Sequence, residues 1–106
     1  MRIFKFGGAS VKDVEGVRNL AKVLLETGTN RTFLVVSAMG KMTNAMEAVV
    51  DAYFRDKEAV TPALEAVESY HLGILRELFP SEGHQVYREV RALFTEIRGF
   101  LAWNKS

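Results

Sequence analysis

The sequence predicts an α/β fold that begins with a parallel strand–helix–strand unit and ends in a helical hairpin. A short segment at residues 2–6, apolar at Ile3, Phe4 and Phe6, and a continuous apolar run within residues 32–36 are separated by one amphipathic helical pattern. Continuous apolar runs are typical of strands in parallel sheets, which helices cover on both faces. Residues 61–106 then carry two helical patterns, each with one apolar stripe. Two buried strands joined by a helix are expected to form a right-handed crossover.

The first strand is expected at Arg2–Phe6 and the second at Thr32–Val36, the latter buried on both faces. Between them, Asp13 can cap a helix that extends to about Glu26, because its short carboxylate can accept hydrogen bonds from first-turn amides. Gly28 lies where a glycine commonly ends a helix. The apolar stripe of this helix consists of Val14, Val17, Leu20, Ala21 and Leu24.

Threonine and proline mark the starts of the next two helices. Thr43 or Asn44 is expected to cap the second helix, and Thr61 the third, with Pro62 in its first turn. The apolar positions of the second helix are Ala45, Met46, Val49, Val50 and Tyr53. Those of the third are Leu64, Val67, His71, Ile74, Leu75 and Leu78.

A fourth helix is expected to pack antiparallel against the third. Pro80 ends the third helix, because proline cannot continue its hydrogen-bonding pattern, and Ser81 can cap the fourth. The fourth apolar stripe comprises Val86, Val90, Leu93, Phe94, Ile97 and Leu101. We therefore expect one domain segment over residues 1–106, with the strands and their loops at 1–60 and the helical hairpin at 61–106.

Composition excludes several classes of function. The formal net charge is +1, so the chain has no large single-sign field to attract nucleic acid or an anionic membrane. It contains no cysteine, which excludes disulfides and cysteine-ligated zinc and permits a cytoplasmic location. No apolar run approaches the ~20 residues that a membrane-spanning helix needs. The N-terminus also lacks the pattern of a secretory signal.

Two parallel strands by themselves leave backbone hydrogen-bonding groups open at both edges of the sheet. The chain is therefore expected to be the start of a larger α/β domain. Taken alone it is expected to self-associate, through strand pairing or helix exchange. The expected contact residues are Phe100, Leu101 and Trp103.

The most informative stretch is the loop after the first strand, with the sequence Lys-Phe-Gly-Gly-Ala-Ser-Val at residues 5–11. Its two glycines allow close approach of the backbone to a ligand, and successive amides in such a turn form a concave site for anions. Lys5 adds a positive charge beside them. This chemistry favours a phosphate, although neither a G-x-G-x-x-G fingerprint nor a Walker A loop is present.

A second loop follows the second strand, with the sequence Ser-Ala-Met-Gly-Lys-Met-Thr-Asn at residues 37–44. Ligands of parallel sheets bind at the carboxyl ends of the strands, so the two loops are expected to lie side by side. Each of them also runs toward a helix N-terminus, where free amides favour anions.

Together the two loops resemble those of aspartokinases, members of the amino-acid kinase family. The usual family forms are Lys-Phe-Gly-Gly-Thr-Ser-Val and Val-Val-Ser-Ala-Met-Gly-x-x-Thr-Asn, and the resemblance covers about residues 1–54. It implies a three-layer αβα parallel-sheet fold, of which this chain holds the N-terminal βαβ unit and a helical hairpin. Ala9 departs from the common threonine, which removes a hydroxyl at this position.

The resemblance also implies transfer of the γ-phosphoryl group of ATP, accompanied by Mg²⁺, to the side-chain carboxylate of L-aspartate. The product is 4-phospho-L-aspartate, in the first step of lysine, threonine and methionine biosynthesis. Lys5 would stabilise the charge of the transferred group, Gly7 and Gly8 would offer amides to phosphate oxygens, and Ser10 a hydroxyl. The implied residues for the amino-acid substrate are Ser37, Ala38, Gly40 and Thr43.

Other interpretations of these residues stay open. Thr43 is a good helix cap whatever it binds, and Gly40 can be turn chemistry alone. One alternative is a related kinase of the acetylglutamate or uridylate type, although the Ser-Ala-Met-Gly-x-x-Thr-Asn segment argues against it, because those kinases usually have a glycine-rich loop there. Another is a non-catalytic module that binds a partner through its helical hairpin. The adenine pocket and the later substrate contacts of the family are expected beyond Ser106. The residues do not show which feedback effector binds the longer enzyme or what its oligomeric state is. They also do not show whether a homoserine dehydrogenase domain follows.

Overall fold

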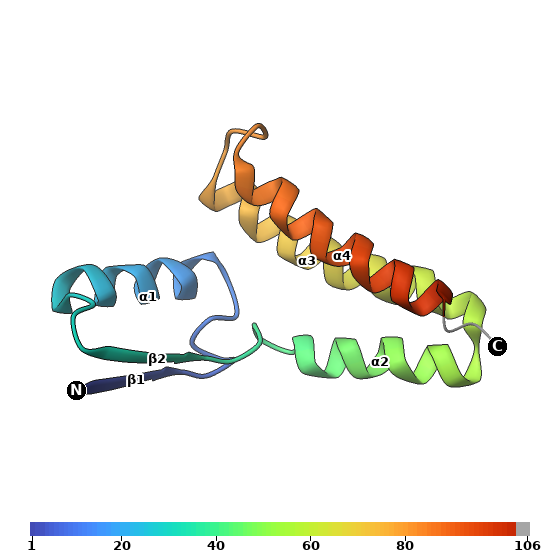
Figure 1. Cartoon of the computed structure of the whole chain (residues 1–106), viewed down its shortest axis with the longest axis horizontal. Helices are drawn as coiled ribbons and strands as arrows, with labels where there is room; N and C mark the ends of the chain where they lie inside the picture. The colour runs from blue at the N-terminus through green and yellow to red at the C-terminus, as the bar shows by residue number, and fades with distance from the viewer. Residues whose placement is uncertain (104–106) are drawn as a thin grey trace. The chain divides into compact units, whose positions relative to one another are not determined.

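The computed structural model describes residues 1–103, and within them it contains two strands and four α-helices (Figure 1). The chain divides into a first unit, residues 1–44, and a second unit that begins at Ala45. The predicted mixed α/β class is confirmed, with a two-stranded parallel sheet. No helix in the described part of the chain is long and apolar enough to cross a membrane.

The first unit contains β1 (Arg2–Phe6), α1 (Val14–Thr27) and β2 (Thr32–Val36). The strands are parallel, in a register that pairs Arg2 with Thr32 and Phe6 with Val36, so both predicted strands are confirmed. Asp13 caps α1 as predicted, because its carboxylate accepts a hydrogen bond of 2.9 Å from the Gly16 amide. Gly28 ends the helix with a positive φ of 77°, and its amide donates to the Leu24 carbonyl.

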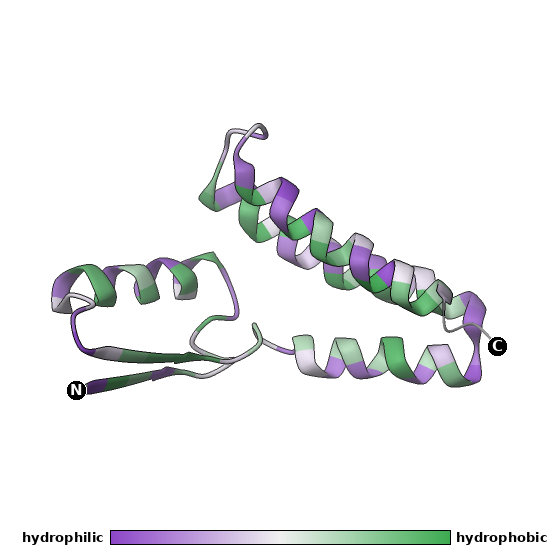
Figure 2. Cartoon of the chain, in the orientation of Figure 1, coloured by the Kyte–Doolittle hydropathy of each residue, from purple (hydrophilic) through white to green (hydrophobic). Residues whose placement is uncertain are grey.

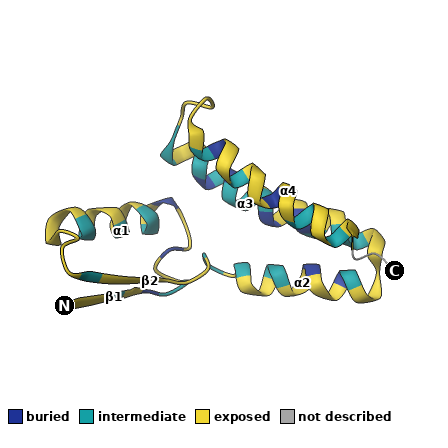
Figure 3. Cartoon of the chain, viewed as in Figure 1, coloured by how far each residue is buried: buried dark blue, intermediate teal, exposed yellow. Residues whose placement is uncertain are grey.

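The prediction that β2 is buried on both faces is wrong. Phe33 to Val36 are between 38% and 58% exposed, and Figure 3 shows both strands largely in the exposed class. A continuous apolar run is buried only where helices cover both faces and strands flank it. Within the first unit β2 has one neighbouring strand, and the core of this unit is small. It consists of Phe6, Val11 and Val14.

The helices that follow are α2 (Met42–Arg55), the short 3₁₀ helix η1 (Lys57–Ala59), α3 (Val60–Leu78) and α4 (Gln85–Trp103). Pro62 lies in the first turn of α3, and α3 ends before Pro80, as predicted. The predicted caps are wrong. Thr43 and Asn44 lie inside the first turn of α2, which begins at Met42. Thr61 lies inside α3, because η1 runs directly into this helix and places Ala59 at its cap.

The start of α4 also differs from the prediction, because the helix begins at Gln85 and not after Ser81. The Ser81 carbonyl instead accepts the His84 amide in a turn. His84 then places its ring next to the helix start, where Nδ1 accepts a hydrogen bond of 3.1 Å from the Val86 amide. The same ring lies 4.5 Å from the ring of Phe79, between centroids. His84 therefore has a structural role.

The helices α3 and α4 lie side by side and antiparallel (Figure 1), and hydrophobic and hydrophilic residues alternate around each of them (Figure 2). The buried residues of this hairpin are Leu64, Val67, Leu72, Ile74, Tyr87 and Phe94. Of these, Leu72 and Tyr87 were missed by the predicted stripes. Leu93 was included wrongly, because it is 59% exposed.

Two polar contacts hold the hairpin together besides its apolar core. The Tyr87 hydroxyl donates to the Phe79 carbonyl at 2.5 Å, close to the connection between the helices. Arg98 on α4 forms an ion pair with Glu68 on α3, and this hydrogen bond raises the pKa of the Arg98 guanidinium. The described residues leave no buried side-chain nitrogen or oxygen without a hydrogen-bond partner.

Candidate functional site

The two loops singled out in the sequence meet at the carboxyl ends of β1 and β2. The Ser37 amide donates to the Phe6 carbonyl at 2.9 Å, which extends the ladder of the sheet by one bond. The Gly40 amide then donates to the Gly8 carbonyl, also at 2.9 Å. These bonds hold residues 7–11 against residues 37–41, as expected for loops that leave neighbouring parallel strands.

Gly8 is a glycine because the two loops touch through their backbones. A Cβ atom at this position would lie 3.0 Å from the Ala38 carbonyl oxygen and 3.0 Å from the Gly40 carbonyl oxygen. Gly40 adopts a positive φ of 51°, which glycine tolerates at no steric cost. Gly7 differs from both, because a Cβ added there would have no atom within 4 Å. The space beside Gly7 is therefore open to a ligand.

The first loop folds into a tight turn around the Gly7 carbonyl, which accepts the amides of Ser10 and Val11 at 3.0 and 3.3 Å. Val11 is buried and anchors the end of the turn. Within residues 1–103, the amides of Gly7, Gly8 and Ala9 donate no hydrogen bond to another protein group. Consecutive unpartnered amides of this kind can bind the oxygens of a phosphate.

Gly16, which lies outside both sequence motifs, lets α1 pack closely against this turn. A Cβ atom at Gly16 would lie 2.2 Å from the Ser10 carbonyl oxygen and 3.2 Å from the Val11 Cα. The helix therefore approaches the loop through bare backbone. The available signal was a glycine inside a helical pattern, which costs helix stability and usually has a packing reason.

The remaining predicted residues are distributed along the same loops. Lys5 is exposed on β1 opposite Val35, two residues before Gly7. Ser10, Ser37 and Ala38 are exposed, and Thr43 is exposed in the first turn of α2. The structure thus brings Gly8, Ala38 and Gly40 into direct contact, and it places the others on adjoining positions of the two loops. Their roles toward ligands stay predictions.

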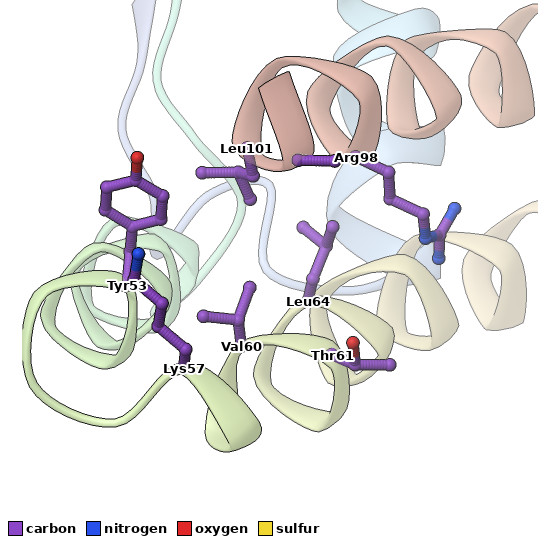
Figure 4. A pocket seen from close by; sticks show the side chains of 8 residues that line it. Tyr53, Lys57, Val60, Thr61, Leu64, Arg98 and Leu101 are labelled. Atoms are coloured by element: carbon purple, nitrogen blue, oxygen red, sulfur yellow. The ribbon is translucent and has the colours of Figure 1, made fainter. Parts of the chain in front are cut away.

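The charged groups of the described residues make no cluster of three or more histidine, aspartate or glutamate side chains that could hold a metal ion. A cavity of about 300 Å³ lies elsewhere, within the second unit (Figure 4). It is lined by residues from the end of α2, η1, the start of α3 and the end of α4. None of the residues predicted to bind phosphate or substrate lines it.

Comparison with known proteins finds plant aspartokinases. The chain is 36% identical over 81 residues to the chloroplastic bifunctional aspartokinase/homoserine dehydrogenase 2 of Arabidopsis thaliana, covering 76% of the chain and 9% of the relative. It is 40% identical over 70 residues to the bifunctional aspartokinase/homoserine dehydrogenase of Daucus carota, covering 65% of the chain and 8% of the relative. With aspartokinase 2 of Arabidopsis thaliana the identity is 31% over 98 residues, 92% of the chain and 17% of the relative.

The chain thus spans less than a fifth of the length of these relatives. No protein-family model matches it. No solved structure matches it either.

Proposed function

Because this chain is related to the aspartokinases, as its two loops indicated, we propose that it carries the phosphate-binding and amino-acid-binding loops of an aspartokinase catalytic domain. The domain would have the three-layer αβα amino-acid kinase fold, to which this chain contributes a strand–helix–strand unit and a helical hairpin. The observation that carries the proposal is the hydrogen bond from the Gly40 amide to the Gly8 carbonyl, which holds the two family motifs against each other.

In the proposed reaction, a carboxylate oxygen of L-aspartate forms a bond to the γ-phosphorus of ATP. The bond from this phosphorus to the β,γ-bridging oxygen breaks, which gives 4-phospho-L-aspartate and ADP. A carboxylate is already a nucleophile, so the protein needs no general base and acts by positioning and by stabilising charge. Lys5 supplies a positive charge, while the amides of Gly7 and Gly8 and the hydroxyl of Ser10 donate to phosphate oxygens.

The residues of the first loop fit a nucleotide phosphate, because this loop combines unpartnered amides, open space beside Gly7 and a nearby lysine. Mg²⁺, when bound, neutralises phosphate charge and is expected to arrive with the nucleotide. On the second loop, the hydroxyls of Ser37 and Thr43 are proposed to hold L-aspartate. Ala38 and Gly40 allow its close approach, because neither has a bulky side chain.

The rival kinases, of the acetylglutamate or uridylate type, are disfavoured because all four matching relatives are named as aspartokinases or as bifunctional enzymes that include one. The expected small-molecule partner is therefore L-aspartate, with the pathway to lysine, threonine and methionine as its setting. No nucleic-acid or membrane partner is expected, in keeping with the net charge of +1. The relatives are named as chloroplastic, and a cytoplasmic location of this chain stays a prediction.

The proposal is tested by amide nuclear magnetic resonance spectra of the ¹⁵N-labelled chain. Addition of ATP with Mg²⁺ should shift the amide signals of Gly7, Gly8 and Ala9. L-Aspartate should shift those of Ser37 and Gly40, and N-acetylglutamate or uridylate should not. Shifts confined to residues outside both loops, or stronger responses to either rival substrate, would contradict the proposal.

The 106-residue chain alone is expected not to phosphorylate aspartate at a measurable rate. The region that matches the relatives is at most 17% of their length, so most of the contacts to the nucleotide and substrate are expected elsewhere in the longer enzymes. Trapping of the acyl phosphate with hydroxylamine measures this directly. A clear ATP-dependent signal from the purified chain would show that the two loops suffice for the reaction.

A further inference from the structure

The first turn of α1 lies directly against the backbone of the first loop. A Cβ atom at Gly16 would lie 2.2 Å from the Ser10 carbonyl oxygen and 3.0 Å from the Ser10 carbonyl carbon. The shorter distance is far below any van der Waals contact, so the observed arrangement admits only glycine at this position. Because the contact joins two backbone segments, no rotation of a side chain can relieve it.

The helix is anchored on its own side of this contact. Val14 at the start of α1 is 8% exposed and belongs to the same small core as Phe6 and Val11. The Asp13 carboxylate also holds the first turn, through its hydrogen bond from the Gly16 amide at 2.9 Å. Movement of α1 away from the loop would uncover this core, and interiors are too closely packed to absorb such a shift. A side chain at Gly16 is therefore expected to displace the loop.

The loop has less to lose, because Ser10 is exposed and its displacement uncovers no apolar side chain. The Ser10 amide donates to the Gly7 carbonyl at 3.0 Å, which closes the turn over Gly8 and Ala9. A shift of Ser10 would thus change the orientation of the amides of Gly7, Gly8 and Ala9. Within residues 1–103 these are the three consecutive amides of the loop that donate to no protein group.

We propose that Gly16 is a positioning residue of the phosphate site. The bare backbone of α1 at Gly16 holds Ser10, and through Ser10 it holds the amides of Gly7, Gly8 and Ala9 in the orientation that a nucleotide phosphate requires. This role rests on the proposed kinase function, because it concerns the same phosphate site. Gly16 itself makes no contact with the ligand and acts only through the loop.

Gly16→Ala in the full chain tests this role, with ¹⁵N amide spectra recorded at increasing concentrations of ATP and Mg²⁺. The variant should bind ATP about tenfold more weakly than the parent chain, because groups that bind a phosphate must be held to within about 0.5 Å. Even without ATP, the amide signals of Gly7, Gly8 and Ala9 should differ from those of the parent chain. Far-ultraviolet circular dichroism confirms that the helices are retained.

Leu20→Ala is the matched control for a general loss of stability. It removes a half-buried side chain of α1, four residues beyond the contact with the loop, and it should destabilise the same unit. Its ATP affinity should stay within about twofold of that of the parent chain, because distant sites act independently. Its loop amide signals without ATP should also stay unchanged.

A second measurement uses the parent chain alone and decides the question if Gly16→Ala does not fold. Addition of ATP should shift the Cα signal of Gly16, which lies against the Ser10 carbonyl, and should leave that of Lys22 near the end of α1 in place. Parental ATP affinity in Gly16→Ala, or a Gly16 signal that stays unchanged while the loop amides respond, overturns the positioning role. If the loop amides of the parent chain do not respond to ATP at all, the proposed kinase function is refuted and the positioning role falls with it.

Discussion

Glycines that look alike in the sequence lie in different surroundings in the structure. A Cβ atom at Gly8 would lie 3.0 Å from two backbone oxygens of the second loop, which is tighter than an ordinary van der Waals contact, whereas Gly7 faces open space. The sequence motif named both residues but could not distinguish them, because their difference arises from the 37–41 loop. The sequence motifs do not include Gly16, because its importance comes from the close approach of its backbone to the Ser10 carbonyl. No local sequence pattern indicates such a contact between two backbone segments.

The different surroundings of Gly8 and Gly7 can be tested by replacing each of them with alanine. Gly8→Ala should lower the free energy of unfolding by about 1–3 kcal/mol, because the new methyl group forces the two loops apart. Gly7→Ala, the matched control, should change it by less than about 0.5 kcal/mol. Urea unfolding of both variants measures the difference, and equal effects would show that the loops are not held in contact.

The proposed role of Lys5 can be tested in an aspartokinase that contains this segment. Lys5→Ala should lower kcat about 10²-fold, as expected when a preorganised charge stabiliser is removed. Lys5→Arg should not restore it, since the guanidinium differs in size and shape from an ammonium group. Lys41→Ala, which removes an exposed lysine on the second loop, is the control for steady-state kinetics. If Lys5→Ala keeps a kcat near that of the parent, the charge must come from another residue.

The sequence predicted the two strands with the observed bounds, and the capped helix between them to within one residue at its end. These elements have strong local signals: apolar runs for the strands, and Asp13 and Gly28 for the helix ends. The starts of α2, α3 and α4 were wrong, because each depends on a neighbouring turn. At the start of α4, the His84 ring accepts a hydrogen bond from the Val86 amide, a contact that no capping rule identifies.

Two glycines inside helices should respond in opposite ways to replacement by alanine. Gly73→Ala in α3 should raise the free energy of unfolding by about 0.5–1 kcal/mol, because alanine favours the helix and a Cβ there meets no atom within 4 Å. Gly16→Ala in α1 has the same helical preference but should lower stability by about 2 kcal/mol or more, since its methyl group would overlap the Ser10 carbonyl. Thermal unfolding of the two variants should thus shift in opposite directions, and shifts of the same sign would contradict the close approach of α1 to the loop.

For the whole molecule, the expected α/β class and the antiparallel hairpin are present, and the burial of the second strand is not. The apolar run predicted a covered strand because such runs are typical of strands inside larger sheets. Within the first unit, however, the second strand has only one neighbouring strand, and its side chains are exposed. The cavity of the second unit could not be predicted either. Its lining comes from α2, η1, α3 and α4, and no single stretch of sequence carries its pattern.

We expect the chain to self-associate in solution. Phe33 and Val36 are exposed on the sheet, and Phe100 and Trp103 are exposed on α4, so water contacts apolar surface in both units. Light scattering coupled to size exclusion should therefore give a mass above the 11.9 kDa of one chain. Trp103→Ser should reduce the associated fraction, and Arg91→Ser, an exposed position outside this apolar surface, should not. A homogeneous monomer at high concentration would refute the prediction.

The bond from the Gly40 amide to the Gly8 carbonyl has a consequence for how two ligands would bind. A phosphate that orders the first loop also restrains the second, because each end of this bond belongs to a different loop. The second ligand then loses less conformational entropy on binding, so the affinities rise together. In the proposed site, linkage would make this synergy reciprocal: L-aspartate would tighten nucleotide binding by the same factor by which the nucleotide tightens binding of L-aspartate.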